Sequence, residues 1–205
     1  MTMTRISRQQ LPIWLFILVP LASTGVIAAT LLTNGLNETG FQLAARYTVR
    51  ISLPLFLLAY SASALKQLFP SEITRWLRRN RRYIGINFAI AHFIHMGAFI
   101  MFFTFIDEVP DLLTVLGGGS TYLLIAALAL TSNNWSVHTL GKAWHWLHRV
   151  GIHAIWATFF ALYLGRLSDP GLLSVGASGA GVLIFFAALR LVALASTRRK
   201  RVQTI

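Results

Sequence analysis

The feature that most constrains the fold of this chain is a series of six long apolar stretches along its 205 residues. Five of them are long enough for an α-helix of roughly 20 residues to cross the apolar layer of a membrane, and the fourth is shorter. Only helices and closed barrels satisfy all backbone hydrogen bonds in that layer. The sequence therefore predicts an all-α integral membrane protein, a six-helix bundle that forms one domain over residues 1–205. The expected spans are about 11–33, 47–68, 83–106, 119–132, 145–166 and 172–195.

The basic residues predict which way the bundle crosses the membrane. The segments on the side of the N-terminus carry Arg5, Arg8, Lys66, Arg75, Arg78, Arg79, Arg81, Arg82, Lys142, Arg198, Arg199, Lys200 and Arg201. The other side carries Arg46, Arg50 and Arg166. Because cytoplasmic loops are enriched in lysine and arginine, both termini are expected in the cytoplasm of a bacterial inner membrane. The net charge of +12 then indicates contact with anionic lipid headgroups of the bilayer, and no nucleic-acid partner is expected.

The absent residue types and motifs limit the chemistry. Cysteine is absent, so any redox reaction must belong to a cofactor held by other ligands. No acidic residue lies inside a span, which argues against a proton relay built from carboxylates. The chain also lacks the common nucleotide-binding and hydrolase motifs. An electron-transfer subunit is therefore favoured over a complete enzyme.

Four histidines lie inside the expected spans. His92 and His95 belong to AIAHFIHMGAFIMFF, and His148 and His153 belong to WLHRVGIHAIWATFFALYL. An ionisable side chain inside a span indicates a functional site, and neutral imidazole is a frequent ligand of haem iron. Two helices that each carry two histidines predict a metal ion or a haem held between the third and the fifth span.

The depth of each histidine narrows the expected ligand pair. At 1.5 Å per residue, His92 lies about 15 Å and His153 about 13 Å from the basic ends of their helices, His95 about 20 Å and His148 about 6 Å. His92 or His95 opposite His153 is therefore the expected pair. In the alternative interpretation, the histidines form hydrogen bonds between helices of a non-redox membrane protein, such as a small transporter or an assembly factor.

Two groups of basic residues are candidate contacts for a cofactor or a partner. Arg46 and Arg50 are four residues apart on one face of the second span, where they are expected to pair with haem propionates or with a redox partner on the outer side. The cytoplasmic cluster Arg75, Arg78, Arg79, Arg81 and Arg82, with Lys142, is expected to meet anionic lipid or an acidic flavoprotein.

Two segments resemble the ferric-reductase-like transmembrane family. RRYIGINFAIAHFIH (81–95) is similar to its RR-x-LG-L…LH pattern, and residues 128–156 are similar to its LA-x-TS…LG-x-x-W-x-x-LHR pattern. The similarity is greatest to the haem-binding membrane subunits of bacterial methionine sulfoxide reductase systems. It implies a haem b that carries electrons across the inner membrane from quinol or a cytosolic flavoprotein to a periplasmic partner, with FMN as a further cofactor.

The same resemblance carries the ligand role to His95 and His148 by position. The family has a second histidine in the fifth span, thirteen residues after that of LHR, where this chain has Ala161. His92 and His153 are additional. Either the haem lies at the level of these two histidines, or the chain is a divergent branch with a different partner.

Overall fold

The computed structural model describes residues 11–202, which form seven α-helices, one short 3₁₀ turn and no strand. The all-α fold class is thereby confirmed. The helices are α1 (Ile13–Asn34), α2 (Glu38–Leu68), α3 (Glu72–Phe105), α4 (Leu112–Leu130), α5 (Asn134–Leu140), α6 (Lys142–Gly165) and α7 (Leu173–Val202), with the 3₁₀ turn η1 (Arg166–Ser168) between α6 and α7. Arg5 and Arg8, to which the topology prediction refers, lie outside the described residues, as do the side chains of residues 198–201.

Five of these helices are long and apolar enough to cross a membrane. They cover Ile13–Asn34, Glu38–Leu68, Glu72–Phe105, Lys142–Ser168 and Leu173–Thr197. A sixth span is possible if Thr114–Leu130 and Asn134–Leu140, which are bent by 102° at their junction, act together. The outside of the bundle exposes large apolar side chains such as Leu32, Leu123 and Phe185. Because a soluble monomer rarely exposes so extensive an apolar surface, the fold is that of a multi-pass membrane protein.

Several helices begin earlier than hydropathy predicts, because polar side chains cap them outside the apolar stretches. The Asn37 side chain accepts a hydrogen bond from the Gly40 amide, so α2 begins well before residue 47. A capping box between Ser71 and Thr74 begins α3, so this helix starts well before residue 83. Asp111 caps α4, so this helix begins before residue 119 and includes the glycines at 117–119.

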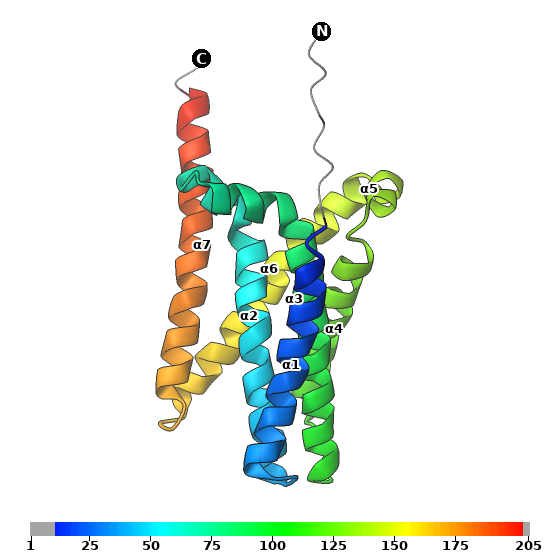
Figure 1. The fold of residues 1–205 in the computed structure, drawn as a ribbon. Helices are drawn as coiled ribbons and strands as arrows, with labels where there is room; N and C mark the ends of the chain where they lie inside the picture. The colour runs from blue at the N-terminus through cyan, green and yellow to red at the C-terminus, as the bar shows by residue number, and fades with distance from the viewer. Residues whose placement is uncertain (1–10, 203–205) are drawn as a thin grey trace.

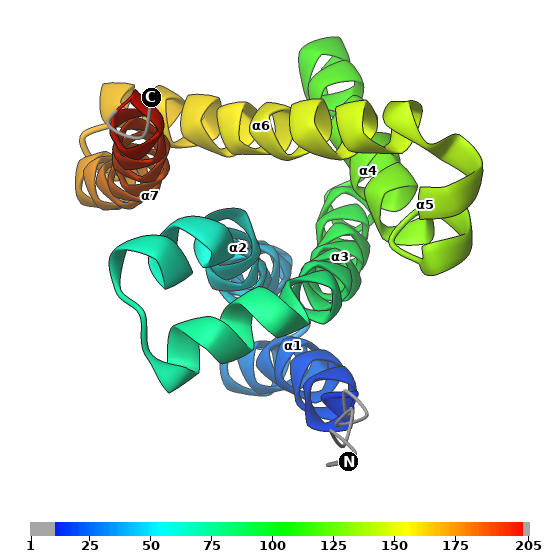
Figure 2. The same cartoon turned by 90° about the horizontal axis from the view of Figure 1, so that it is seen from above.

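The helices differ in their tilt (Figures 1 and 2). α1, α2 and the main part of α3 stand side by side, while the first turns of α3 lie across the top of the view in Figure 1. α6 runs diagonally from α5 at the top to α7 at the bottom. From above, α6 forms one edge of the molecule, with α4 near its beginning and α7 at its end.

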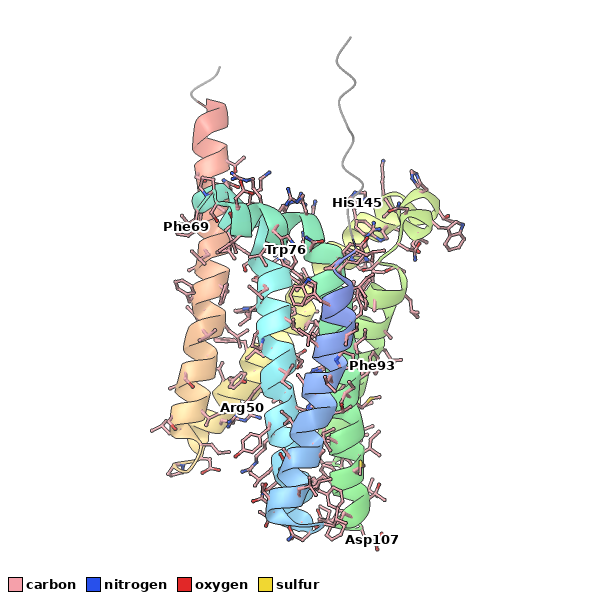
Figure 3. All side chains as sticks on the ribbon, viewed as in Figure 1. Arg50, Phe69, Trp76, Phe93, Asp107 and His145 are labelled. Atoms are coloured by element: carbon pink, nitrogen blue, oxygen red, sulfur yellow. The ribbon has the colours of Figure 1, made fainter. Side chains whose placement is uncertain are left out.

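The two ends of the bundle differ in charge, and we name them accordingly. The basic end holds the α2–α3 turn and α5, with Phe69, Trp76 and His145 (Figure 3). The acidic end holds the α1–α2, α3–α4 and α6–α7 connections, with Asp107. The acids of these connections are Glu38, Asp107, Glu108, Asp111 and Asp169.

The interior contains two apolar clusters. The larger joins α2, α3, α4, α6 and α7 around aromatic rings, among them Phe56, Phe88 and Phe159. The smaller joins α1, α2 and α3 around Ala62 and Ile84. Large side chains thus fill the space between α6 and the α1–α3 group, and the ring of His92 borders this cluster.

Candidate functional site

One face of α2 faces the histidines. Thr48, Ser52, Phe56 and Tyr60 are spaced four residues apart, so they lie above one another on the helix. All four side chains are buried. We call this row the α2 stripe.

His92 and His95 of α3 bind to the hydroxyl groups of the α2 stripe. Nδ1 of His92 lies 3.1 Å from Ser52 Oγ, and Nδ1 of His95 lies 3.0 Å from Thr48 Oγ1. Ser52 Oγ also donates to the Val49 carbonyl, and Thr48 Oγ1 donates to the Ala44 carbonyl. Since a hydroxyl has one proton, this favours protonated Nδ1 atoms that donate to both hydroxyls. Nε2 of His92 then keeps its lone pair, while His95 also forms a hydrogen bond with the backbone of Ala45.

His153 of α6 meets the last member of the stripe. Its Nδ1 lies 3.4 Å from the Tyr60 hydroxyl oxygen, and the two rings pack edge to face at 5.6 Å. No hydrogen bond to Nε2 of His153 is formed by the described residues. The side chain of His153 is exposed, although Tyr60 is buried. His153 therefore also offers Nε2, at the edge of the aromatic cluster.

His148 differs from the other three histidines because its Nε2 is already in use. It lies 2.9 Å from Thr131 Oγ1, and the ring stacks on Trp144 at 4.1 Å. Trp144 in turn donates to the Thr131 carbonyl, which closes the turn after α4. His148 thus connects α4 to α6 near the basic end.

The histidines of α3 and α6 do not share a level. His92 meets Ser52 and His153 meets Tyr60, and these two residues of α2 lie about two helical turns apart, roughly 12 Å along the axis. His92 and His153 thus lie at different depths, whereas counting residues predicted nearly equal depths for them. The reason is visible in Figure 1: α6 crosses the bundle diagonally, so each of its residues gains less depth than a residue of an upright helix.

A file of aromatic rings connects the two levels. The ring of His92 lies 5.5 Å from Phe159, Phe159 lies 5.5 Å from Phe56, and Phe56 lies 5.6 Å from Tyr60. On its other side, His92 stacks on Tyr122 of α4 at 4.9 Å. This packing excludes water from His92 and makes its surroundings apolar and polarisable.

The expected outer-side arginines are not part of this cluster. Arg46 and Arg50 are both exposed on α2, and the Arg50 guanidinium carbon lies 4.8 Å from the ring centre of Tyr47. Within the described range neither contacts a histidine. The cation within electrostatic reach of His95 is Arg166.

The donor chemistry of this cluster fits a haem better than a bare metal ion. The described residues contain no group of three histidine, cysteine or acidic side chains that could hold a metal ion. A haem needs one or two protein ligands, and a ligating histidine normally donates its second ring N–H to a nearby oxygen. His92 and His95 have this arrangement, and His153 has a weaker version of it. His148 would have to give up its bond to Thr131.

Arg190 and the hydroxyl partners on α2 were not predicted from the sequence. Arg190 lies on α7 within the sixth predicted span, and its Nη1 donates to the Tyr60 carbonyl. Its guanidinium carbon lies 4.1 Å from the centre of the Tyr60 ring. The available signal was a lone arginine in an apolar span, which by itself indicates a functional site. Thr48, Ser52 and Tyr60 gave a weaker signal, a row of hydroxyl groups with a spacing of four.

Comparison with known proteins finds no relative for this arrangement: no family model matches the chain, and neither a curated protein nor a solved structure does.

Proposed function

We propose that the protein is a b-type cytochrome subunit that moves electrons across a bacterial inner membrane, as the ferric-reductase-like resemblance implies. The observation that carries this proposal is the pair His92 and His95. Both rings are held at Nδ1 by buried hydroxyls, and the buried ring of His92 packs against Tyr122 and Phe159. Either of these oriented imidazoles could hold a haem iron through its second ring nitrogen. A bound haem supplies reversible one-electron transfer at its iron.

The residues of the chain have distinct parts in this proposal. Ser52 and Thr48 hold the α3 imidazoles in one orientation and one tautomer. Phe159 and Tyr122 pack against His92 and keep water away, which tunes the potential of a bound haem through burial. His153, two turns nearer the basic end, offers a second ligating nitrogen at its own level.

The ends of the bundle give the proposed direction of transfer. Following the charge asymmetry, the basic end and both termini face the cytoplasm. Electrons enter there from quinol or from a cytosolic flavoprotein, which is oxidised, and leave for a redox partner protein at the periplasmic acidic end, which is reduced. FMN stays a proposal that rests on the resemblance alone.

The proposal is tested by a reduced-minus-oxidised absorption spectrum of the protein purified from cells supplied with haem. We expect the bands of a b-type cytochrome, with about one or more haems per chain by the pyridine haemochrome assay. Absence of any haem band under these conditions, in protein that is otherwise folded and monodisperse, would reject the cytochrome proposal.

A second candidate function, a non-redox helical membrane protein, is favoured by one observation. Each buried histidine already has a protein partner, and rings occupy the space between the two levels. The histidines would then tie α3 to α2, with no metal involved. This candidate predicts stable protein without iron, so the iron content of the purified protein distinguishes the two.

Electron entry at the basic end makes a testable prediction. Reversing two exposed charges there, with Arg78→Glu and Lys142→Glu, should slow reduction by an acidic flavoprotein about tenfold or more at low salt, because steering by opposite charges is lost. The difference should shrink at high salt, and reduction by dithionite should not change. Stopped-flow absorbance measures both rates, and Arg46→Glu at the other end is the matched control. Unchanged flavoprotein kinetics would leave quinol as the donor.

A further inference from the structure

Two asparagine side chains are buried on the face of α3 that meets α1 and α2. Asn87 has no exposed surface, and only 5% of Asn80 is exposed. Along α3 they alternate with Leu77, Ile84 and Ala91, which belong to the smaller apolar cluster. Because the five residues follow one another at intervals of three and four, they share one face of the helix. Two polar side chains therefore lie in an interface that is otherwise apolar.

Each of these carboxamides has a partner for its nitrogen only. Nδ2 of Asn80 donates to the Trp76 carbonyl at 3.0 Å, and Nδ2 of Asn87 donates to the Tyr83 carbonyl at 2.9 Å. Since only the nitrogen can donate to a carbonyl, these bonds fix the orientation of both carboxamides. The two Oδ1 atoms are buried, and no donor within residues 11–202 binds either of them. A buried oxygen without a donor is destabilising, so each oxygen indicates a further ligand.

The two oxygens lie where α3 bends. Trp76 belongs to the part of α3 that lies across the basic end, and Phe93 belongs to the part that stands upright beside α1 and α2 (Figure 3). The bend is thus between these residues, as are Asn80 and Asn87. α3 contains no proline. Bends without proline are typical of helices in which a side chain or water binds the backbone carbonyls, as the two carboxamide nitrogens do here.

Water is the ligand that suits both oxygens. A metal cation needs about six or more oxygen ligands around one point, whereas Asn80 and Asn87 are about 10 Å apart along the helix. Asn87 has no exposed surface, so its ligand must be small. Proteins commonly hold water at buried polar groups that no side chain satisfies. We propose that Asn80 and Asn87 bind ordered water molecules at the bend of α3.

This inference goes beyond the proposed function and does not depend on it. The asparagines share their face of α3 with the smaller cluster, whereas the ring of His92 borders the larger one. The test therefore uses full-length protein prepared without added haem. Its outcome leaves the cytochrome proposal untouched, and the haem spectrum leaves the water site untouched.

The experiment is radiolytic footprinting of the purified protein with brief X-ray pulses, read by mass spectrometry. Hydroxyl radicals form from water in place, so a buried side chain is labelled when bound water lies beside it. Ile84 is the probe, because it lies within one helical turn of both asparagines. Ile125 is the matched control: it is equally buried, at 2%, but lies in the larger cluster. We expect Ile84 to be labelled about tenfold more than Ile125, since bound water is held at polar groups.

Leucine variants decide whether the asparagines hold the water. Asn80→Leu and Asn87→Leu each replace an oxygen by an apolar group, so labelling of Ile84 should fall toward that of Ile125. Ser61→Ala is the control variant, because it removes a buried hydroxyl that already donates to the Leu57 carbonyl. It should leave the labelling of Ile84 unchanged.

Two results would overturn the water site. The first is equal labelling of Ile84 and Ile125 in the wild type, a comparison that needs no variant and decides even if a leucine variant fails to fold. The second is labelling of Ile84 that stays at the wild-type level in both leucine variants, or that falls as far in Ser61→Ala as in them.

Discussion

If the protein binds haem as proposed, replacing His92 with alanine should remove most of it from the purified protein, whereas replacing His148 should leave most of it bound. The reason is the state of the two Nε2 atoms. Nε2 of His92 is unbonded and lies in a buried, aromatic site, while Nε2 of His148 is 2.9 Å from Thr131 Oγ1 near the basic end. If His92 holds a haem as proposed, its loss should lower the haem content by more than about tenfold, because even the loss of a partner behind a ligand costs ten- to a hundredfold in metal affinity.

The measurement is the haem-to-protein ratio together with the low-spin absorption bands of each variant. His95→Ala and His153→Ala show whether either of these histidines also holds haem. Ser52→Ala is the graded control: His92 stays, but its orientation is no longer held, so haem content should fall less than in His92→Ala. The opposite outcome, a spectrum lost in His148→Ala and kept in His92→Ala, would show that the ligand positions implied by the family resemblance apply and that the hydroxyl argument does not.

The number and type of the main helices followed from the sequence, but where they begin did not. Hydropathy locates the part of a helix that faces lipid, and the expected spans indeed lie within α1, α2, α3, α6 and α7, apart from a residue or two at their ends. A helix begins where its first amides find a hydrogen-bond acceptor. Asn37, Ser71 and Asp111 provide such acceptors in polar segments that hydropathy treats as loops. Cap residues in those segments were therefore the better signal for the helix starts.

The histidines of the candidate site could be selected from the sequence, but their depths in the bundle could not be predicted from it. A histidine in an apolar stretch stands out from composition, so His92, His95 and His153 could be selected. Counting residues gives depth only for an upright helix, and the tilt of α6 depends on its packing against α4 and α7, which the sequence does not state. The sequence also did not indicate that Ser52 and Thr48 contact the histidines. The hydroxyl of a serine or threonine in a span usually donates to a backbone carbonyl of the preceding turn.

The position of Arg190 could be read from the sequence, but its contacts could not. Its position inside an apolar span was evident, but the positive-inside rule considers loops and so passes over a charge within a helix. The structure adds its direction: the guanidinium meets Tyr60, and Tyr60 meets His153. A cation is thereby connected to one of the candidate ligands through a single aromatic side chain.

The second large expected effect is a loss of stability when the contact between α6 and α7 is disturbed. A Cβ atom added to Gly179 would lie 2.1 Å from Cδ1 of Tyr163, far inside van der Waals contact. A Cβ on Gly176 would lie 3.0 Å from the Tyr163 carbonyl oxygen. The Tyr163 ring is buried in the larger cluster, and its outer face is covered by the guanidinium of Arg166. The ring thus has little room to move aside.

Gly179→Leu should therefore push α7 away from α6 and destabilise the protein by about 1–3 kcal/mol or more, the usual cost of overpacking. Thermal unfolding in detergent measures the loss as a midpoint several degrees lower than that of the wild type. Gly181→Leu is the matched control: Gly181 lies two residues away on the same helix, and a Cβ there would meet nothing within 4 Å. Its midpoint should stay close to that of the wild type.

A double variant decides whether the contact with Tyr163 is the cause. Tyr163→Ala alone should destabilise the cluster by leaving a cavity. Combined with Gly179→Leu, it should cost less than the sum of the two single changes, because the leucine occupies the space that the ring has left. Additive effects would mean that Gly179 and Tyr163 do not meet. The close approach of α6 and α7, which sets the diagonal course of α6 and with it the level of His153, would then be incorrect.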